Sequence, residues 1–359
     1  METIVQEKQE SPEYLRMSLA AALTLGFKKG LFYRNAKLYC INLLLNYDNG
    51  CAARCAYCGL SHKRQGEYTE KSFIRVTWPN YPLEEIIERI SKRQNRVKRI
   101  CISMITNKRA ISDTKEICSR LRSSFDVPVS LLVSPTIINR EDLIAFKAAG
   151  ADKIGVAIDL ATPELFEKFR GKGVNGPHKW ERYMECLSDA IEIFGHHNAG
   201  THLVTGMGET EKQMVQIIQK VQDMGGWTHL FSYFPEAESQ MGDHPMPDMD
   251  HYRRIQLARY LIDENISHAR QFEYDESDRV IDFGIRPQRL DKAIDSGEPF
   301  RTSGCEGYDG EVACNRPYAN SRPGPDIRNF PFPPEQADID RIRKQMGRSL
   351  SSDADRQAG

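Results

Sequence analysis

The chain has 359 residues, a formal net charge of −1 at pH 7, and hydrophobic residues at 40% of its positions. This length suits one large domain or two smaller ones, and the near-neutral charge excludes a general electrostatic attraction to nucleic acid or to an anionic membrane. No apolar run approaches the ~20 residues of a membrane span.

The number of cysteines helps to predict the cellular compartment. The stretch from Met1 to Glu10 is too polar and acidic for a secretory signal or a transit peptide. Nine cysteines without such a signal favour metal ligation in a reducing cytoplasm over disulfides.

The first predicted element is a helix that begins at Ser11. Ser11 suits the N-cap and Pro12 the first turn, and apolar residues then recur at helical spacing. Gly26 and Gly30 are predicted to close this helix.

Beyond it, apolar and β-branched runs alternate with amphipathic stretches. The predicted strands are 38–47, 97–104, 127–134, 153–159, 200–206, 228–234 and roughly 267–274. The predicted helices are 83–93, 112–123, 140–149, 163–169, 178–194, 209–224 and 248–265. Strict alternation predicts a parallel sheet, and roughly six to eight units over about 250 residues favour an α/β fold of the (β/α) barrel type, partial or complete.

One short motif stands where the first predicted parallel strand ends. Cys51, Cys55 and Cys58 are spaced C-x3-C-x2-C directly after an apolar run. Three thiolates on a tight loop can hold three irons of a cubane cluster, which leaves the fourth iron open for a small molecule. The alternatives are a zinc site, for which His62 is the only nearby fourth ligand, and three buried thiols.

At these residues the sequence resembles the radical S-adenosylmethionine (SAM) superfamily. The resemblance implies a 4Fe–4S cluster whose open iron chelates SAM, and reductive cleavage of SAM to a deoxyadenosyl radical that removes hydrogen from an unactivated C–H bond. It also implies SAM-binding residues near the strand ends. These are Tyr57 beside the adenine, Ser103 and Met104 at the methionine amino group, Asp159 at the ribose, Arg170 at the methionine carboxylate, and Gly206 and Glu209 near the adenine.

Simpler explanations exist for several of these residues. Asp159 could cap the next helix, and Arg170 could lie on a solvated helix face. Gly206 to Glu209 could be an ordinary tight turn between a strand and a helix.

The region near the C-terminus is rich in Pro, Gly, Asn and Arg and poor in apolar residues. It carries Cys305 and Cys314, which with Cys40 could hold a second iron–sulfur cluster, and Ser303 is a possible oxygen ligand. We expect this region to fold over the barrel mouth. Cys40 would then lie on the order of 20 Å from the first cluster along a straight strand, so Cys101 could replace it. The alternative is a lid with two incidental thiols.

Motifs near the C-terminus narrow the resemblance to one family of radical SAM proteins. Thr302-Ser-Gly-Cys305, Cys314-Asn-Arg-Pro-Tyr318 and Arg322-Pro-Gly324 are similar to the two-protein lipoyl synthases. That family inserts sulfur at C6 or C8 of an octanoyl chain held on a protein lysine, and takes the sulfur from an auxiliary cluster. The implied partners are an octanoylated lipoyl carrier protein, a second radical SAM protein, and an electron donor such as ferredoxin or flavodoxin.

Two other functions stay open. One is another biotin-synthase-like radical SAM reaction in cofactor maturation, and the other is a non-enzymatic iron–sulfur or zinc-binding protein. The expected organisation is an N-terminal helical extension (1–37), a radical SAM barrel (38–285), an auxiliary-cluster or lid segment (286–334), and a polar helix with a disordered tail (335–359).

Overall fold

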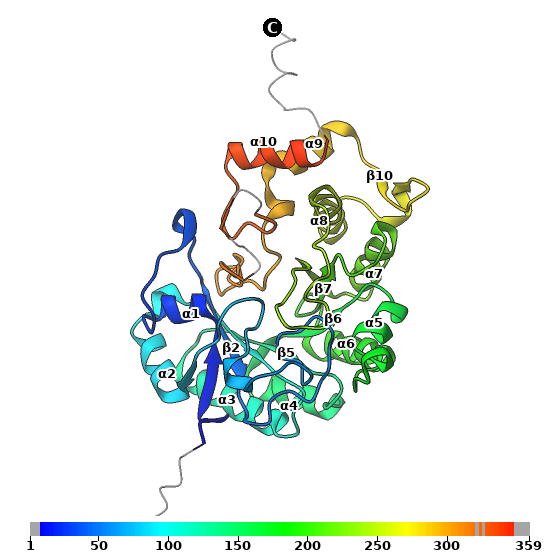
Figure 1. Cartoon of the computed structure of the whole chain (residues 1–359). Helices are drawn as coiled ribbons and strands as arrows, with labels where there is room; N and C mark the ends of the chain where they lie inside the picture. The colour runs from blue at the N-terminus through cyan, green and yellow to red at the C-terminus, as the bar shows by residue number, and fades with distance from the viewer. Residues whose placement is uncertain (1–7, 320–322, 325–326, 348–359) are drawn as a thin grey trace, which may run out of the picture.

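The computed structural model describes residues 8–319, 323–324 and 327–347, and its centre is one eight-stranded sheet (Figure 1). The strand order is β3-β1-β2-β4-β5-β6-β7-β8. The strands are β1 (Tyr14–Met17), β2 (Cys40–Leu45), β3 (Asn80–Pro82), β4 (Arg99–Ser103), β5 (Val129–Val133), β6 (Ala151–Asp159), β7 (Ala199–Thr205) and β8 (Trp227–Ser232). Strands β2 and β4 to β8 are parallel, and β1 and β3 join antiparallel at one edge. Within the described residues β8 does not pair with β3, so the barrel is partial.

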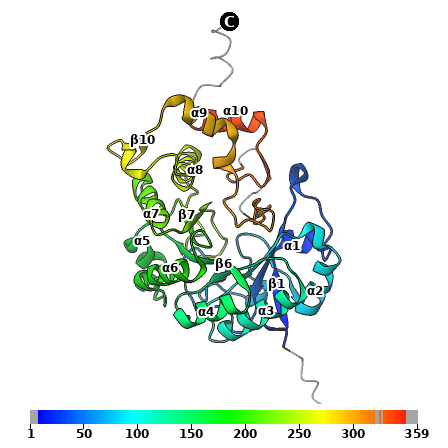
Figure 2. The ribbon, with the colours of Figure 1, turned by 180° about the vertical axis from the view of Figure 1, so that it is seen from behind.

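The helices follow the strands as the alternation predicts. They are α1 (Leu19–Thr24), α2 (Leu83–Ser91), α3 (Ala110–Ser124), α4 (Arg140–Ala148), α5 (Pro163–Phe169), α6 (Trp180–Phe194), α7 (Glu211–Asp223), α8 (Met249–Asp263), α9 (Pro287–Ser296) and α10 (Gln336–Gln345). Figures 1 and 2 show α2 to α7 in an arc around the outside of the sheet. The six predicted strands from 38–47 to 228–234 and the seven predicted helices are confirmed, with shifted ends.

The helix predicted from Ser11 to Gly26 is wrong in its first part and confirmed only at Leu19–Thr24. Residues Tyr14–Met17 form β1, in which Leu15 pairs with Leu45 of β2. The Ser11 hydroxyl does not cap a helix; it accepts a hydrogen bond from the Asn46 N–H (3.0 Å) and donates to the Tyr14 carbonyl (2.9 Å). Helix α1 begins only after Ser18, whose side chain accepts from the Ala21 N–H. Pairing with β2 overrides the helical spacing because both Leu15 and Met17 are fully buried in the sheet.

The strand predicted at 267–274 is also wrong. This stretch holds a 3-10 turn and the two-residue strand β9 (Glu273–Tyr274), which pairs with β10 (Val280–Asp282) in a separate small sheet. Helix α9 has no counterpart in the sequence prediction, whereas α10 is the polar helix expected after Pro334. The tail expected at 351–359 lies outside the described residues.

A buried arginine on β1 holds the loop that follows the cysteine motif. Arg16 is fully buried and donates to the carbonyls of Trp78 (2.9 Å), Tyr68 (2.8 Å) and Lys71. Its guanidinium thereby fixes the path of residues 68–78, which lie over the sheet.

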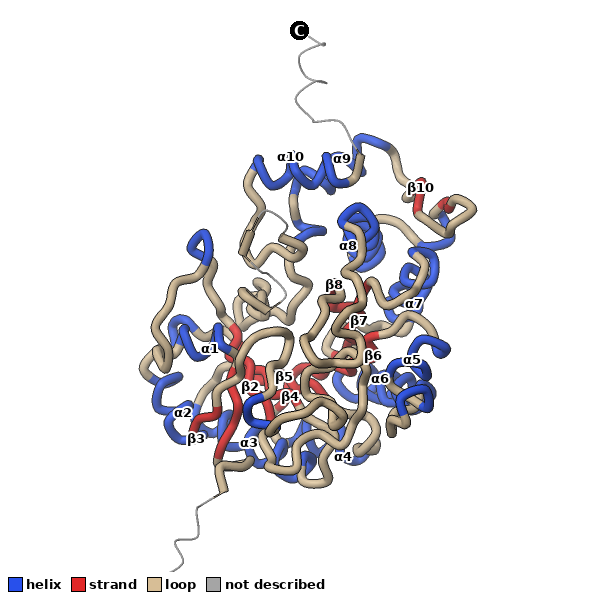
Figure 3. The backbone as a smooth tube through the Cα atoms, viewed as in Figure 1, coloured by secondary structure: helices blue, strands red, loops and turns tan. Residues whose placement is uncertain are grey.

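The segment 301–319, which we call the plug, packs with its residues 303–309 against the end of the half-barrel where the strands begin. Figure 3 shows the plug in tan, as loop. The Ser303 hydroxyl accepts from the Leu230 N–H of β8 (2.8 Å), and the Glu306 carbonyl accepts from Arg99 at the start of β4. Lys153, near the start of β6, lies 3.5 Å from the Glu306 carboxylate.

The expectation that this segment folds over the barrel mouth is therefore wrong for residues 303–309. The basic residues Lys98, Arg99 and Lys153 at the strand starts attract Glu306 and Asp309 of the plug.

None of the helices in the described ranges is long and apolar enough to cross a membrane.

Candidate active site

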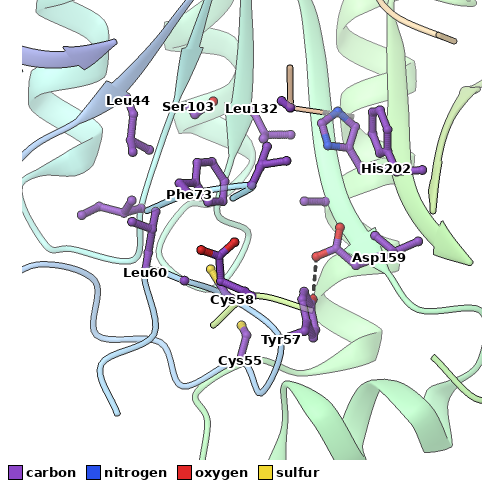
Figure 4. Close-up of a pocket in the computed structure, with 18 of the residues that line it drawn as sticks. Leu44, Cys55, Tyr57, Cys58, Leu60, Phe73, Ser103, Leu132, Asp159 and His202 are labelled. Atoms are coloured by element: carbon purple, nitrogen blue, oxygen red, sulfur yellow. Dashed lines mark hydrogen bonds between the residues drawn. The ribbon is translucent and has the colours of Figure 1, made fainter. Parts of the chain in front are cut away.

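One cavity of about 240 Å³ lies inside the half-barrel and extends from the ends of the strands to their middle. The three-cysteine loop lines the end where the strands finish, and Asn42, His202 and Arg316 line it toward the plug. Figure 4 shows Cys55, Cys58 and Tyr57 grouped at one side of the cavity, with Ser103 and His202 at the other. A molecule that fills this cavity would therefore touch both the three-cysteine loop and Arg316 of the plug.

Backbone hydrogen bonds hold the three-cysteine loop in place. The Ala52 N–H donates to the Thr106 carbonyl after β4 (2.8 Å), and the Ala56 N–H donates to the Phe169 carbonyl at the end of α5 (2.9 Å). Cys51, Cys55 and Cys58 all line the cavity. Burial raises the pKa of the Cys55 thiol to about 11, so a metal must displace its proton.

The zinc alternative depended on His62. This side chain is exposed and lies in a separate polar hollow that touches Cys51 from the outer side. Across the described ranges, no three His, Cys, Asp or Glu side chains are close enough together to hold a single metal ion.

Asp159, Tyr57 and Arg170 form one buried network. The Tyr57 hydroxyl donates to Asp159 Oδ2 at 2.6 Å, and Arg170 Nη1 donates to the same oxygen at 3.0 Å. Arg170 also donates to the Ile158 carbonyl (3.1 Å) and to the Tyr183 hydroxyl (3.2 Å). All three network residues line the cavity, and Asp159 Oδ1 has no hydrogen-bond partner among the described side chains and backbone.

The simpler explanations for two of these residues fail. The N-cap of α5 is Thr162, whose side chain accepts from the Leu165 N–H, so Asp159 is not the helix cap. Arg170 is 6% exposed and does not lie on a solvated face. Asp159 also has a φ of 66°, a left-handed conformation that turns the chain at the end of β6.

The remaining predicted SAM residues divide into two groups. Ser103 and Met104 line the cavity beside the cysteine loop. Gly206 and Glu209 are outside its lining, and the Glu209 carboxylate accepts from the N–H groups of Gly206 (2.6 Å) and Met207 (2.9 Å). In this structure Glu209 stabilises its own turn, and α7 is capped by Thr210.

Four cysteines from three distant parts of the chain meet between the sheet and the plug. Cys40 starts β2, Cys101 lies on β4, and Cys305 and Cys314 come from the plug. Asn42, which lines the cavity, donates to Cys40 Sγ (3.6 Å) and to Cys314 Sγ (3.5 Å). Cys101 and Cys40 both belong to this group of four cysteine side chains, which we call the four-cysteine site.

The thiols of this four-cysteine site differ in pKa. A hydrogen bond from Cys40 and the Arg316 guanidinium hold the pKa of the Cys314 thiol well below its ordinary value, against the effect of burial. Burial raises the pKa of Cys101 to about 12. The predicted oxygen ligand, Ser303, uses its hydroxyl to dock the plug on β8.

Sequence reasoning missed three polar residues at this end of the cavity. Arg316 Nε donates to Cys314 Sγ (3.4 Å), and the rings of His202 and His229 lie 5.4 Å apart. Burial lowers the pKa of His229 to about 3, so the ring is neutral. A signal was present, because Thr-His-Leu occurs in two successive strands, at 201–203 and 228–230, and the two histidines are direct partners in the β7–β8 register.

Residues 45–221 match the family model described as the radical SAM superfamily. The chain carries a radical SAM domain. The match begins at the end of β2, includes the three-cysteine loop, and ends in α7. No curated protein sequence matches the chain.

Solved structures of similar fold accompany this radical SAM match. A structure of HydG, a maturase of the [FeFe]-hydrogenase, has a TM-score of 0.52 at 11% identity, with 91% of this chain and 67% of that chain covered. HydG from Carboxydothermus hydrogenoformans gives a TM-score of 0.49 at 14% identity, over 92% of this chain and 70% of that chain. Methylornithine synthase (PylB) gives 0.48 at 10% identity, over 68% of this chain and 66% of that chain. At these identities the similarity concerns the fold alone.

The radical SAM domain implies a 4Fe–4S cluster and SAM, and the donor set fits them. Three cysteine thiols lie on one loop, as a cluster with one open iron requires, and the cavity begins beside them. Bound there, the cluster and SAM would supply the radical chemistry of the family. Cys51, Cys55 and Cys58 would hold the cluster, and the carboxylate of Asp159 presents a free acceptor toward the same space.

Proposed function

We propose that this radical SAM enzyme inserts sulfur into an octanoyl chain carried on a protein lysine, as one half of a two-protein lipoyl synthase. The observation that carries the proposal is the meeting of Cys40, Cys101, Cys305 and Cys314 behind the far wall of the cavity. Sulfur insertion needs a sulfur source as well as a radical source, and soft thiolate ligands select iron–sulfur clusters.

The cavity wall between the two cysteine sites supports an apolar substrate. Leu44, Leu132, Val204 and Phe231 line it along four strands, and Phe73 covers it from the loop held by Arg16. An aliphatic chain buried there would gain about 25 cal/mol per Å² of apolar surface. The same wall excludes water from the carbon that reacts.

In this proposal the chain's own residues do three things. The wall residues hold the aliphatic chain between the two ends of the cavity. The network of Tyr57, Asp159 and Arg170 holds SAM at the cysteine loop. Asn42 and Arg316, which line the cavity, donate to the Cys40 and Cys314 thiols of the second site behind its wall. An auxiliary cluster bound at the four-cysteine site would supply the sulfide.

The first test is iron and sulfide content after Cys51, Cys55 and Cys58 are all replaced by Ala. We expect residual iron and sulfide, and we expect Cys305→Ala or Cys314→Ala in that background to remove them. Cys118→Ala is the matched control, since Cys118 is a buried cysteine of α3 away from both sites and should leave the residual iron unchanged. An iron-free triple variant would leave the enzyme without a sulfur source and refute the proposal.

The second test addresses substrate and partners. The reconstituted enzyme is incubated with SAM, a reductant and an octanoylated lipoyl carrier protein, with and without a second radical SAM protein. The proposal expects a mass increase of the octanoyl chain that corresponds to one inserted sulfur. SAM cleavage without any thiolated product, with both proteins present, would favour a different reaction in cofactor maturation.

A further inference from the structure

His229 is a histidine that contacts the four-cysteine site. It lies on β8 and is buried at 7% exposure, next to the plug. Its Nδ1 contacts the carbonyl oxygen of Ser303. A carbonyl only accepts hydrogen bonds, so Nδ1 must carry the proton and Nε2 must carry a lone pair.

The lone pair faces a thiol. Nε2 of His229 lies 3.7 Å from Sγ of Cys305, which belongs to the four-cysteine site. A tetrahedral metal with bonds of about 2.3 Å to sulfur and about 2.0 Å to nitrogen separates the two donors by about 3.5 Å. The pair is therefore already close to the spacing of two donors on one iron, which is the arrangement at each iron of a two-iron cluster.

The contact at Nδ1 has the form found at metal-bound histidines. Such a histidine donates its other ring N–H to a carbonyl or carboxylate, which fixes the tautomer and the ring orientation. Here the carbonyl belongs to Ser303, whose hydroxyl is itself anchored on the Leu230 N–H. The plug thus orients His229 and supplies Cys305 from the same short stretch.

His202 provides an internal comparison. It is the register partner of His229 on β7 and lines the cavity, but no hydrogen bond of its ring is found among the described residues. Its ring packs against Phe231 at 5.2 Å. The two histidines share a layer of the half-barrel, and only His229 has an oriented ring with a thiol in front of it.

We propose that His229 is a nitrogen ligand of the auxiliary iron–sulfur cluster, bound through Nε2 beside Cys305. This inference rests on the proposed function, because it requires a cluster at the four-cysteine site. It gives that cluster mixed cysteine and histidine ligation. Neutral imidazole in the ligand set raises the reduction potential of an iron–sulfur cluster relative to all-thiolate ligation.

The test uses the full chain with Cys51, Cys55 and Cys58 replaced by Ala, so that only the auxiliary cluster remains. The reduced protein is examined by pulsed electron paramagnetic resonance, with and without histidine labelled with the heavy nitrogen isotope. We expect a strong nitrogen coupling that changes with the label. His229→Gln should abolish it while iron remains bound, and the matched variant His202→Gln should retain it.

The possible results are distinguishable. A cluster that forms in the triple variant but shows no histidine coupling overturns the His229 assignment and leaves the proposed function intact. The same holds if the coupling survives in His229→Gln. A triple variant without iron overturns both. His229→Cys adds a second readout, because a thiolate at this position should keep iron bound and lower the reduction potential of the auxiliary cluster relative to the chain that retains His229.

Discussion

Replacing Asp159 by Asn is the sharpest test of the SAM site. Oδ2 of Asp159 is occupied by Tyr57 and Arg170, whereas Oδ1 faces the cavity without a partner. If Oδ1 accepts a ribose hydroxyl, loss of the charged acceptor costs about 1.5–3 kcal/mol of binding. That corresponds to ~10- to 150-fold weaker SAM binding.

The substitution also removes the charge that faces Arg170. The side chains are 7% (Arg170) and 15% (Asp159) exposed, and breaking such a buried pair costs about 3–5 kcal/mol of unfolding free energy. SAM affinity must therefore be measured by equilibrium dialysis on protein whose circular dichroism shows it is folded. Tyr57→Phe is the control, because it keeps the carboxylate and the ring and should weaken SAM binding by less than about tenfold. An unchanged dissociation constant for SAM in folded Asp159→Asn would refute the assignment.

Three further predictions concern the cluster, the loop and pH. Replacing Cys51, Cys55 and Cys58 together by Ala should abolish 5′-deoxyadenosine formation after reduction, measured by chromatography; continued formation would show that the cluster binds elsewhere. Arg16→Met strips three loop carbonyls of their donor and should lower the unfolding free energy in urea by about 3 kcal/mol or more; a loss below about 1 kcal/mol would contradict this account. Burial lowers the pKa of His178 to about 2, so below about pH 6.5 the unfolded chain binds a proton that the folded chain does not, and the free energy of unfolding falls as the pH drops. His178→Gln should reduce the slope of unfolding free energy against pH by about 1.4 kcal/mol per pH unit. An unchanged slope would argue against a buried neutral ring.

The parts of the fold that sequence could predict are those encoded locally. Hydrophobic periodicity located the parallel strands and their helices, because each strand and helix buries its own apolar face. The C-x3-C-x2-C loop was equally accessible, since its three ligands lie within eight residues of each other. Strand β1 was not, because its extended form depends on pairing with β2 and on a buried Arg16 that serves a distant loop.

The four-cysteine site was only half predictable. Cys305 and Cys314 stand in a stretch without periodicity, so nothing local states which end of the barrel the stretch covers. The answer comes from long-range contacts, such as that of Arg99 with Glu306. The sequence offered Cys101 only as a replacement for Cys40, whereas the β2–β4 register sets it beside Asn42. His229 needed both the alternation along β8 and the docked plug before its role could be inferred.

The plug also determines the order in which the two cysteine sites are completed during synthesis of the chain. Asn42 and Cys314 touch although they are 272 positions apart in sequence. The ribosome makes the three-cysteine loop and most of the sheet long before it makes Cys305 and Cys314, so the first cluster site is ready while the second is half built. A cluster bridging the early and late halves would close a very long loop, and such closure restricts the unfolded chain more than a short one does. Binding of a cluster at the four-cysteine site would then be the last step that stabilises the folded chain, and loss of that cluster would lower the stability of the whole barrel.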